Sequence, residues 1–100
     1  MEMVELQENA NKAGQLLSVM SNPSRLLVLC YLCGDGEKSV QQMQMQLGIG
    51  QSALSQHLAI LRREKLVNTR RQAQTIYYSL ASEDAKAIMS TLCNIYGDKP

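Results

Sequence analysis

The stretch GIGQSALSQHLAIL, from Gly48 to Leu61, decides the fold of this chain. Its glycine-containing turn at 48–50 leads into an amphipathic helix, which the spacing predicts over 51–64. Leu54, Leu58 and Leu61 recur at i, i+4 and i+7, so they form one apolar stripe that packs inward. At about 100° per residue, the opposite face is made of Ser52, Ser55, Gln56, Ala59 and Arg63.

The exposed face of this predicted helix is unusual because its first two turns carry hydroxyls and amides but no charge. Serine and glutamine side chains both donate and accept hydrogen bonds, which suits them to base edges in the major groove of DNA. The first turn also presents unpaired backbone N–H groups and a positive dipole end, which favour phosphate. We therefore interpret the segment as a DNA-recognition helix.

A second short helix precedes it. Ser39 is a suitable N-cap for a helix over Val40–Leu47, with its apolar residues facing inward and its glutamines outward. Two short helices separated by a three-residue turn that contains glycine match a helix-turn-helix. The first would be the supporting helix, and 51–64 the recognition helix.

After Lys65 the periodicity changes from helical to alternating. The segments 66–71 and 75–80 are rich in β-branched and aromatic residues, with a polar tip at Gln72-Ala73-Gln74, so they predict a β-hairpin. A lone hairpin is marginal in water and must pack on the helices. Its Arg70 and Arg71 would reach phosphates or the minor groove beside the recognition helix.

The remaining segments predict flanking helices. An apolar helix over 24–32 follows the stop signal Ser21-Asn22-Pro23, in which Asn22 caps the helix, and Ser82 caps a last helix over about 82–96. A first helix, about 4–20, carries a narrow seam at 3.5-residue spacing. That seam consists of Leu6, Ala10, Ala13, Leu17 and Met20. Such a seam often pairs with another chain, and packing within the subunit is the alternative.

The predicted fold is therefore mainly α with a small β-hairpin, in the order ααααββα, which is a winged helix-turn-helix. One hundred residues with 45% hydrophobic content make one domain, 1–100, with a modest core. The net charge is only +1, but residues 61–71 carry five basic side chains against Glu64. This segment indicates one anionic contact surface, although a solvated charged face would give the same pattern.

Three cysteines, Cys30, Cys33 and Cys93, are an odd number in a sequence with no secretory h-region. No apolar run approaches the roughly 18 residues of a membrane span. We therefore expect a reducing cytoplasm, free thiols and no membrane partner. The simplest expectation for all three side chains is burial in apolar packing. Cys30 and Cys33 form Cys-x-x-Cys near a helix C-terminus, where the dipole raises rather than lowers a thiol pKa.

Several segments together resemble the ArsR/SmtB family of bacterial repressors, and within it the NolR-like and HlyU-like members. The resemblance spans roughly 16–98 and lies chiefly in 51–58, 61–62, 66–67, 69–71 and 74–78, with weaker matches at 20–27 and 95–98. It implies a homodimer, built from the first and last helices, on an imperfect palindrome, with two recognition helices in successive major grooves. By similarity, the groove contacts are Gln51, Ser52, Ser55 and Gln56, and the wing contacts are Arg70, Arg71 and Gln72.

Many members of this family sense metals through thiolates or through His and carboxylates. Here the predicted third helix has no thiol and the last has no His, and zinc requires about four ligands. The sole His, His57, is expected to be a structural residue. We therefore predict no metal, no cofactor and no small-molecule ligand. Other members pair a thiol on the second helix with one at the end of the last. Cys30 matches the first position, but the second falls at Gly97, so the pair is broken. The alternative is a switch that uses Cys30 with Cys93, one turn earlier, or with Cys33; a disulfide needs Cα atoms within about 7 Å.

The main hypothesis is a sequence-specific, metal-independent DNA-binding regulator, expected to be a repressor, that acts as a homodimer in a bacterial cytoplasm. A thiol- or persulfide-responsive repressor is the alternative. An enzyme is not favoured, because the sequence shows no catalytic arrangement and no phosphate loop. A pure protein-interaction module differs from the main hypothesis in predicting no salt-dependent DNA binding.

Overall fold

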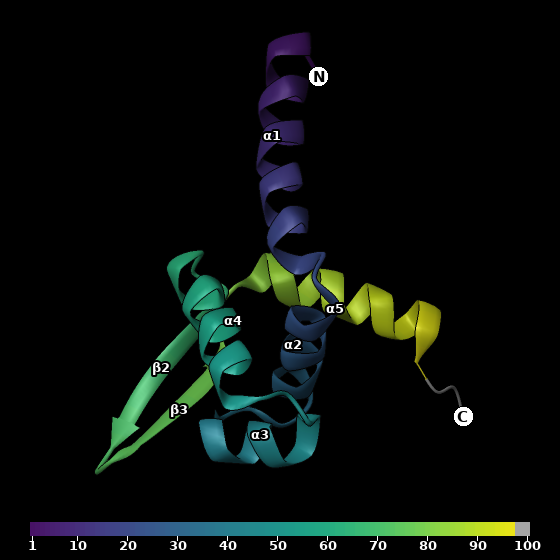
Figure 1. The fold of residues 1–100 in the computed structure, drawn as a ribbon. Coiled ribbons are helices and arrows are strands. Elements are labelled where there is room, and N and C mark those ends of the chain that lie inside the picture. The colour runs from purple at the N-terminus through teal and green to yellow at the C-terminus, as the bar shows by residue number, and fades with distance from the viewer. Residues whose placement is uncertain (98–100) are drawn as a thin grey trace.

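The computed structural model describes residues 1–97, apart from the side chain of Asp35. The predicted tail residue Asp98, together with 99–100, lies outside the described residues. Within 1–97 the helices and strands follow the predicted order, with one addition (Figure 1). They are α1 (Met3–Met20), α2 (Pro23–Asp35), β1 (Lys38–Ser39), α3 (Val40–Leu47), α4 (Gln51–Arg63), β2 (Val67–Gln72), β3 (Thr75–Leu80) and α5 (Glu83–Tyr96).

The sequence signals for the helix starts are confirmed. The Asn22 side chain accepts hydrogen bonds from the backbone N–H groups of Ser24 and Arg25, and Pro23 occupies the first helical position. Ser39 accepts from Gln42 N at 3.1 Å, and the Gln42 side chain accepts from Ser39 N at 2.8 Å, which completes a capping box. The third cap is Ser82, which accepts from the backbone of residue 85.

The helix-turn-helix itself is formed by α3 and α4. Gly48 ends α3 in the left-handed conformation with φ 66°, which glycine adopts without the steric cost of a Cβ. At its other end, α4 closes with a hydrogen bond from Leu66 N to Leu61 O at 2.9 Å, while Lys65 has a φ of 65°. This is a Schellman-type end, and it turns the chain directly from the recognition helix into β2.

The sheet differs from the predicted two-stranded hairpin. It has three antiparallel strands in the order β1-β3-β2, with Lys38 opposite Tyr78 and Ser39 opposite Tyr77. β1 was missed because two residues are too few to show a period-2 pattern. The extra strand lies next to the start of α3, so it joins the supporting helix to the wing formed by β2 and β3.

The core lies where α2, α3, α4 and α5 meet. Its buried stripes include Leu54, Leu58 and Leu61 of α4, as the spacing predicted. The remaining buried apolar residues are Met20, Val28, Leu29, Leu32, Met43, Leu66, Val67, Ala85 and Met89. The core therefore holds α4 by one side and leaves the other side open to solvent.

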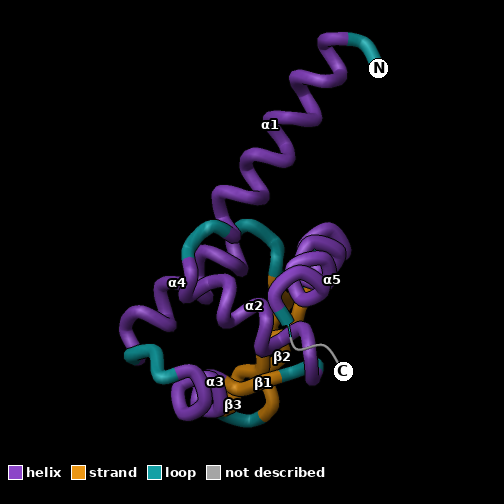
Figure 2. Tube along the Cα trace, turned by 90° about the vertical axis from the view of Figure 1, so that its right-hand side faces the viewer, coloured by secondary structure: helices purple, strands orange, loops and turns teal. Residues whose placement is uncertain are grey.

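α1 is the exception to this packing. It projects well beyond the rest of the molecule in both views (Figures 1 and 2). Only its last turns contact the core: Met20 is buried, Leu16 and Val19 pack against the core, and the Arg25 Nε donates to the Val19 carbonyl at 2.7 Å. The rest of the seam, residues 6, 10, 13 and 17, is exposed in the single chain.

Across residues 1–97, no single helix has the length and hydropathy needed to cross a membrane. Among these residues, only α1 and residues 23–34 taken together are long and apolar enough, and a 91° bend separates the two.

Candidate nucleic-acid interface

The solvent-facing side of α4 carries the polar residues that its periodicity placed there. Gln51, Ser52, Ser55, Gln56 and Arg63 are all exposed. On the other side of the helix, the three leucines of the stripe are at most 2% exposed. Since that stripe anchors α4 firmly, the five side chains form one continuous face on a rigid element.

The start of α4 is open to an anion. Its N-cap residue is Gly50, which has no side chain to occupy the first backbone N–H groups. The first intrahelical hydrogen bond runs from Leu54 N to Gly50 O, so the N–H groups of residues 51–53 have no acceptor within the helix. Together with the positive dipole end, these N–H groups favour a phosphate oxygen.

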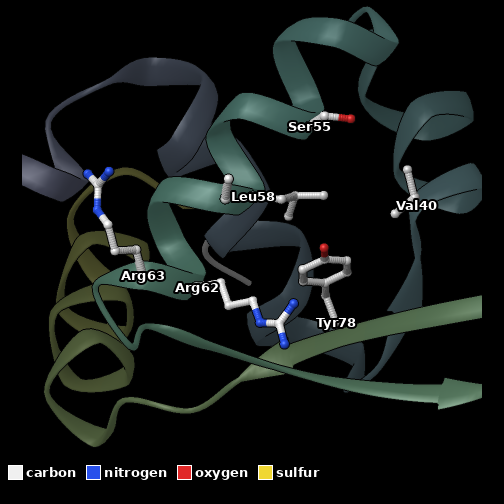
Figure 3. A pocket seen from close by; sticks show the side chains of 7 residues that line it. Val40, Ser55, Leu58, Arg62, Arg63 and Tyr78 are labelled. Carbon is white, nitrogen blue, oxygen red and sulfur yellow. The ribbon is translucent and has the colours of Figure 1, made fainter.

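A cleft of about 480 Å³ separates α4 from the wing. Ser55, Leu58 and Arg62 line it from α4, and Tyr78 lines it from β3 (Figure 3). The Arg62 side chain extends towards the wing strands, and Arg63 also lines the cleft, with its guanidinium pointing away from that of Arg62. The cleft therefore combines a cation with a polar hydroxyl next to the exposed face of α4.

Arg62 and Tyr78 were not among the residues that the sequence analysis proposed. A signal for Arg62 was present, because Ser55, Ala59 and Arg62 follow one another at i, i+4 and i+7 along one side of α4. Tyr78 could not have been placed, because its position depends on how the wing packs against α4.

The two adjacent arginines of the wing lie on opposite faces of its strands. Arg71 is opposite Ile76 in the strand register, and Arg70 is opposite Tyr77. Arg71 is exposed, and no hydrogen bond or ion pair engages it among the described residues. The Arg70 guanidinium instead donates to both carboxylate oxygens of Glu37, from Nε at 2.8 Å and from Nη2 at 3.0 Å. The predicted site residues of the wing therefore differ in their availability to a ligand.

Gln72 is part of the same arrangement as Arg70. Its side-chain oxygen accepts a hydrogen bond from Arg70 Nη1 at 3.0 Å. The Arg70 guanidinium also lies over the Tyr77 ring, 4.8 Å from its centroid. The hydrogen bonds from Arg70 lower the pKa of Glu37, and Glu37 raises that of Arg70. Both side chains therefore stay charged and paired at neutral pH.

His57 lies on the less exposed side of α4. It is half-buried, and its Nδ1 is buried without a hydrogen-bond partner. Among the described residues, no three His, Cys, Asp or Glu side chains come together as they would around a metal ion. In that part of the chain, His57 therefore does not belong to a group of side chains that could hold a metal ion.

The expectation that the cysteines are buried is wrong for the single chain, since Cys30, Cys33 and Cys93 are all exposed. α2 buries only one face, and its thiols lie on the other. Cys30 and Cys93 face each other across α2 and α5, beside an apolar groove that both line. Desolvation of the sulfur raises the pKa of Cys30, and the neighbouring thiols of Cys93 and then Cys33 raise it further.

The sequence is similar to a known protein family and to characterised regulators. Residues 22–69 match the model described as "Bacterial regulatory protein, arsR family". The transcriptional activator HlyU of Vibrio cholerae is 48% identical over 96 residues, which cover 96% of this chain and 88% of HlyU. The nodulation protein NolR of Rhizobium meliloti is 49% identical over 94% of this chain and 76% of its own.

Solved structures of regulators with similar sequences also superimpose on this chain. Reduced HlyU from Vibrio cholerae superimposes with a TM-score of 0.89 at 48% identity, covering 94% of this chain and 98% of the other. The transcriptional repressor BigR of Xylella fastidiosa has a TM-score of 0.87 at 36% identity, with 99% and 100% of the two chains covered. The similarity therefore extends over α1 and α5 as well as over the helix-turn-helix.

Proposed function

Since this chain belongs to the arsR family of bacterial regulatory proteins, and is thus a DNA-binding transcription regulator and not an enzyme, we propose that it is a repressor that binds an imperfect palindrome as a homodimer. Each copy would insert α4 into one major groove, and the two grooves would lie about one helical turn apart. Bound over a promoter, the dimer would exclude RNA polymerase sterically. We further propose that residues 1–100 form a single domain that acts in the cytoplasm.

The observation that carries this proposal is the contrast between the two faces of α4. Its fully buried residues are the three leucines, and its exposed face offers hydroxyls and amides to base edges without a competing acid. We assign base contacts to Gln51, Ser52, Ser55 and Gln56, since their side chains can both donate and accept. We assign phosphate contacts to Arg62, Arg63 and Arg71.

The dimer is proposed from the state of α1. An 18-residue helix that contacts its own subunit only near its end leaves apolar side chains in water, among them Leu6 and Leu17, which are 50% and 52% exposed. On α5, Ile95 and Tyr96 are 59% and 82% exposed. Pairing of these helices, about 4–20 and 82–96, with those of a second copy would bury both sets.

We propose that DNA binding needs no metal and no small-molecule ligand. The family resemblance suggests ligand positions on the third and last helices, and the residues at those positions lack the thiolates and histidines that zinc prefers. The absence of a three-ligand cluster among the described residues supports this proposal. DNA affinity should therefore be unchanged by a chelator.

The salt dependence of binding tests the proposed function. The affinity of the dimer for duplex DNA should fall steeply and log-linearly as salt rises, because each phosphate contact releases about 0.9 counterion. The affinity can be measured by fluorescence anisotropy between 50 and 200 mM salt, with a polyanion such as heparin as the comparison. A chain that serves only as a protein-interaction module would show no binding to duplex DNA at any salt concentration.

As a second candidate function we propose a thiol switch added to the repressor, since Cys30 and Cys93 are neighbours beside one groove. The two thiols would lose two protons and two electrons to a peroxide, which is reduced to water, and form a disulfide between α2 and α5. Such a bond would change how the two helices pack and so alter the dimer. The test compares DNA affinity with and without peroxide for the natural chain and for Cys30→Ser. Equal affinities in all four measurements would leave the cysteines without a regulatory role.

A further inference from the structure

The side chain of Arg70 is held within the chain by three other side chains. Both oxygens of the Glu37 carboxylate accept from it, the Gln72 amide oxygen accepts from it, and the Tyr77 ring lies beneath it. We name this set, Glu37, Arg70, Gln72 and Tyr77, the wing clamp. A bidentate guanidinium–carboxylate pair fixes both the direction and the plane of the side chain, so it constrains geometry more than a single contact would.

The strand register places the wing clamp on the side of the wing that faces away from α4. Side chains of directly opposite residues share one face, and successive residues alternate. Arg70 therefore shares a face with Tyr77, while Arg71 shares the other with Ile76 and Tyr78. Tyr78 lines the cleft beside α4, so the face of Arg71 is the one directed towards the recognition helix.

Glu37 belongs to a different part of the fold from Arg70. It immediately precedes β1 (Lys38–Ser39), and Ser39 caps α3, the supporting helix. The ion pair therefore connects β2 to the segment that starts the helix-turn-helix, across 33 residues of sequence. The pairing of β1 with β3 already ties this segment to one strand of the wing, and the Glu37–Arg70 ion pair adds a second link, to β2.

Building on the proposed DNA-binding function, we propose that Glu37 is a positioning residue for DNA binding, and that it acts through Arg70 to hold the wing so that Arg71 meets the phosphate backbone. Arg70 is then a structural residue of the wing and not a phosphate contact. The side chains of Arg70 and Glu37 remain 49% and 39% exposed, so solvent screens the pair and its contribution lies in geometry rather than in global stability.

The two possible roles of Arg70 make opposite predictions for Glu37. If Glu37 positions the wing, Glu37→Ala weakens binding even though it removes a negative charge near DNA. If Arg70 instead contacts phosphate, Glu37→Ala strengthens binding, because it frees the guanidinium and reduces repulsion. The expected loss on positioning grounds is about fivefold, near the upper limit for an exposed ion pair.

A charge swap is the decisive experiment, because it keeps the net charge of the chain constant. Glu37→Arg and Arg70→Glu should each weaken binding to duplex DNA, and the double variant should restore it to within about twofold. The matched control is Arg71→Glu combined with Glu37→Arg, which has the same net charge but should not be restored. If the Glu37/Arg70 swap binds as weakly as Arg70→Glu alone, Arg70 contacts phosphate and the proposal is overturned.

A measurement without DNA separates this inference from the proposed function. Amide hydrogen exchange in the free protein should be faster across residues 70–75 in each single variant and should return to the natural rate in the swap. Unchanged exchange in the single variants would show that the pair does not hold the wing. Failure of the natural chain to bind DNA would contradict the proposed function, and the exchange rates would still decide whether the wing clamp exists.

Discussion

Arg70 and Arg71 are consecutive in the chain, yet they lie on opposite faces of the wing. Arg70 is bound by Glu37 behind the wing, and Arg71 is exposed on the face that Ile76 and Tyr78 share. Successive side chains of a β-strand point to opposite faces of the sheet, so these two arginines have different surroundings. The distinction determines what each substitution in the wing should do.

Arg71→Ala should weaken binding to specific and random DNA alike, because phosphate contacts carry no sequence information. It should also reduce the slope of log affinity against log salt by about 0.9 per lost contact, hence about 1.8 for a dimer. Fluorescence anisotropy of the natural chain and of Arg71→Ala, each titrated over a range of salt concentrations, measures the two slopes. Lys12→Ala on α1 is the control. A slope equal to that of the natural chain would exclude Arg71 from the DNA contact surface.

Gln56→Ala should lower affinity for the preferred site by about 1–3 kcal/mol per base contact and leave random DNA almost unaffected, because it removes a base-edge contact. Competition binding with the selected duplex and a scrambled one measures the ratio. Gln7→Ala on α1 is the control, since it removes the same amide elsewhere. An equal loss on both duplexes would make Gln56 a backbone contact.

Leu17→Glu should convert the dimer to a monomer and abolish high-affinity DNA binding without unfolding the subunit. Leu17 is half-exposed in the single chain, so a charge there leaves the core intact but would be buried unpaired in the paired helices. Sedimentation equilibrium and circular dichroism report the two effects. Asn11→Glu adds the same charge outside the seam and should remain dimeric. A dimeric Leu17→Glu would move the dimer contact away from α1.

Cys30 should be alkylated slowly at neutral pH, with a rate that rises with pH to beyond 9.0, because desolvation and then Cys93 raise its pKa above that ordinary value. Cys93→Ala removes the contribution of Cys93 and should shift the plot of alkylation rate against pH to lower pH. The shift should be partial, because desolvation of the Cys30 sulfur remains. Mass spectrometry of the Cys30 peptide after timed iodoacetamide treatment gives the rates. An unshifted profile would show that Cys93 does not act on Cys30.

Lys65→Gly should stabilise the fold by about 0.5–1 kcal/mol. Lys65 has a φ of 65°, a conformation that is unfavourable for an L-residue and not for glycine. The greater entropy of glycine in the unfolded chain offsets part of this gain. Lys65→Ala is the matched control: it removes the same charge but keeps the strained conformation. Denaturant unfolding of the three chains measures the difference. A less stable Lys65→Gly would mean that the side chain of Lys65 contributes more than its backbone costs.

The parts of the fold that depend on local signals could be predicted from the sequence. The leucine stripe of α4 and the caps at Asn22, Ser39 and Ser82 are determined by residues within one or two turns, and all were confirmed. The exposed polar face of α4 follows from the same spacing. The winged helix-turn-helix order, reached from these segments, agrees with the structures of related regulators.

The parts that depend on contacts between distant segments could not be predicted. β1 is recognisable only because Lys38 and Ser39 pair with Tyr78 and Tyr77 of β3, which lie far along the chain. Nothing near Arg70 in the sequence indicates Glu37, so the two arginines of the wing were treated alike. The exposure of Cys30 and Cys93 likewise depends on which face of α2 the core uses, and an apolar sequence such as 26–32 does not reveal that face.

The most direct test of the account is to select bound duplexes from a random pool and measure the mass of the complex that they form. The account predicts two copies of the chain per duplex and an imperfect palindrome whose half-site centres lie about 10–10.5 base pairs apart, or a multiple of that spacing. A complex with one chain, or a selected pool without a repeated half-site, would contradict the paired insertion of two α4 helices.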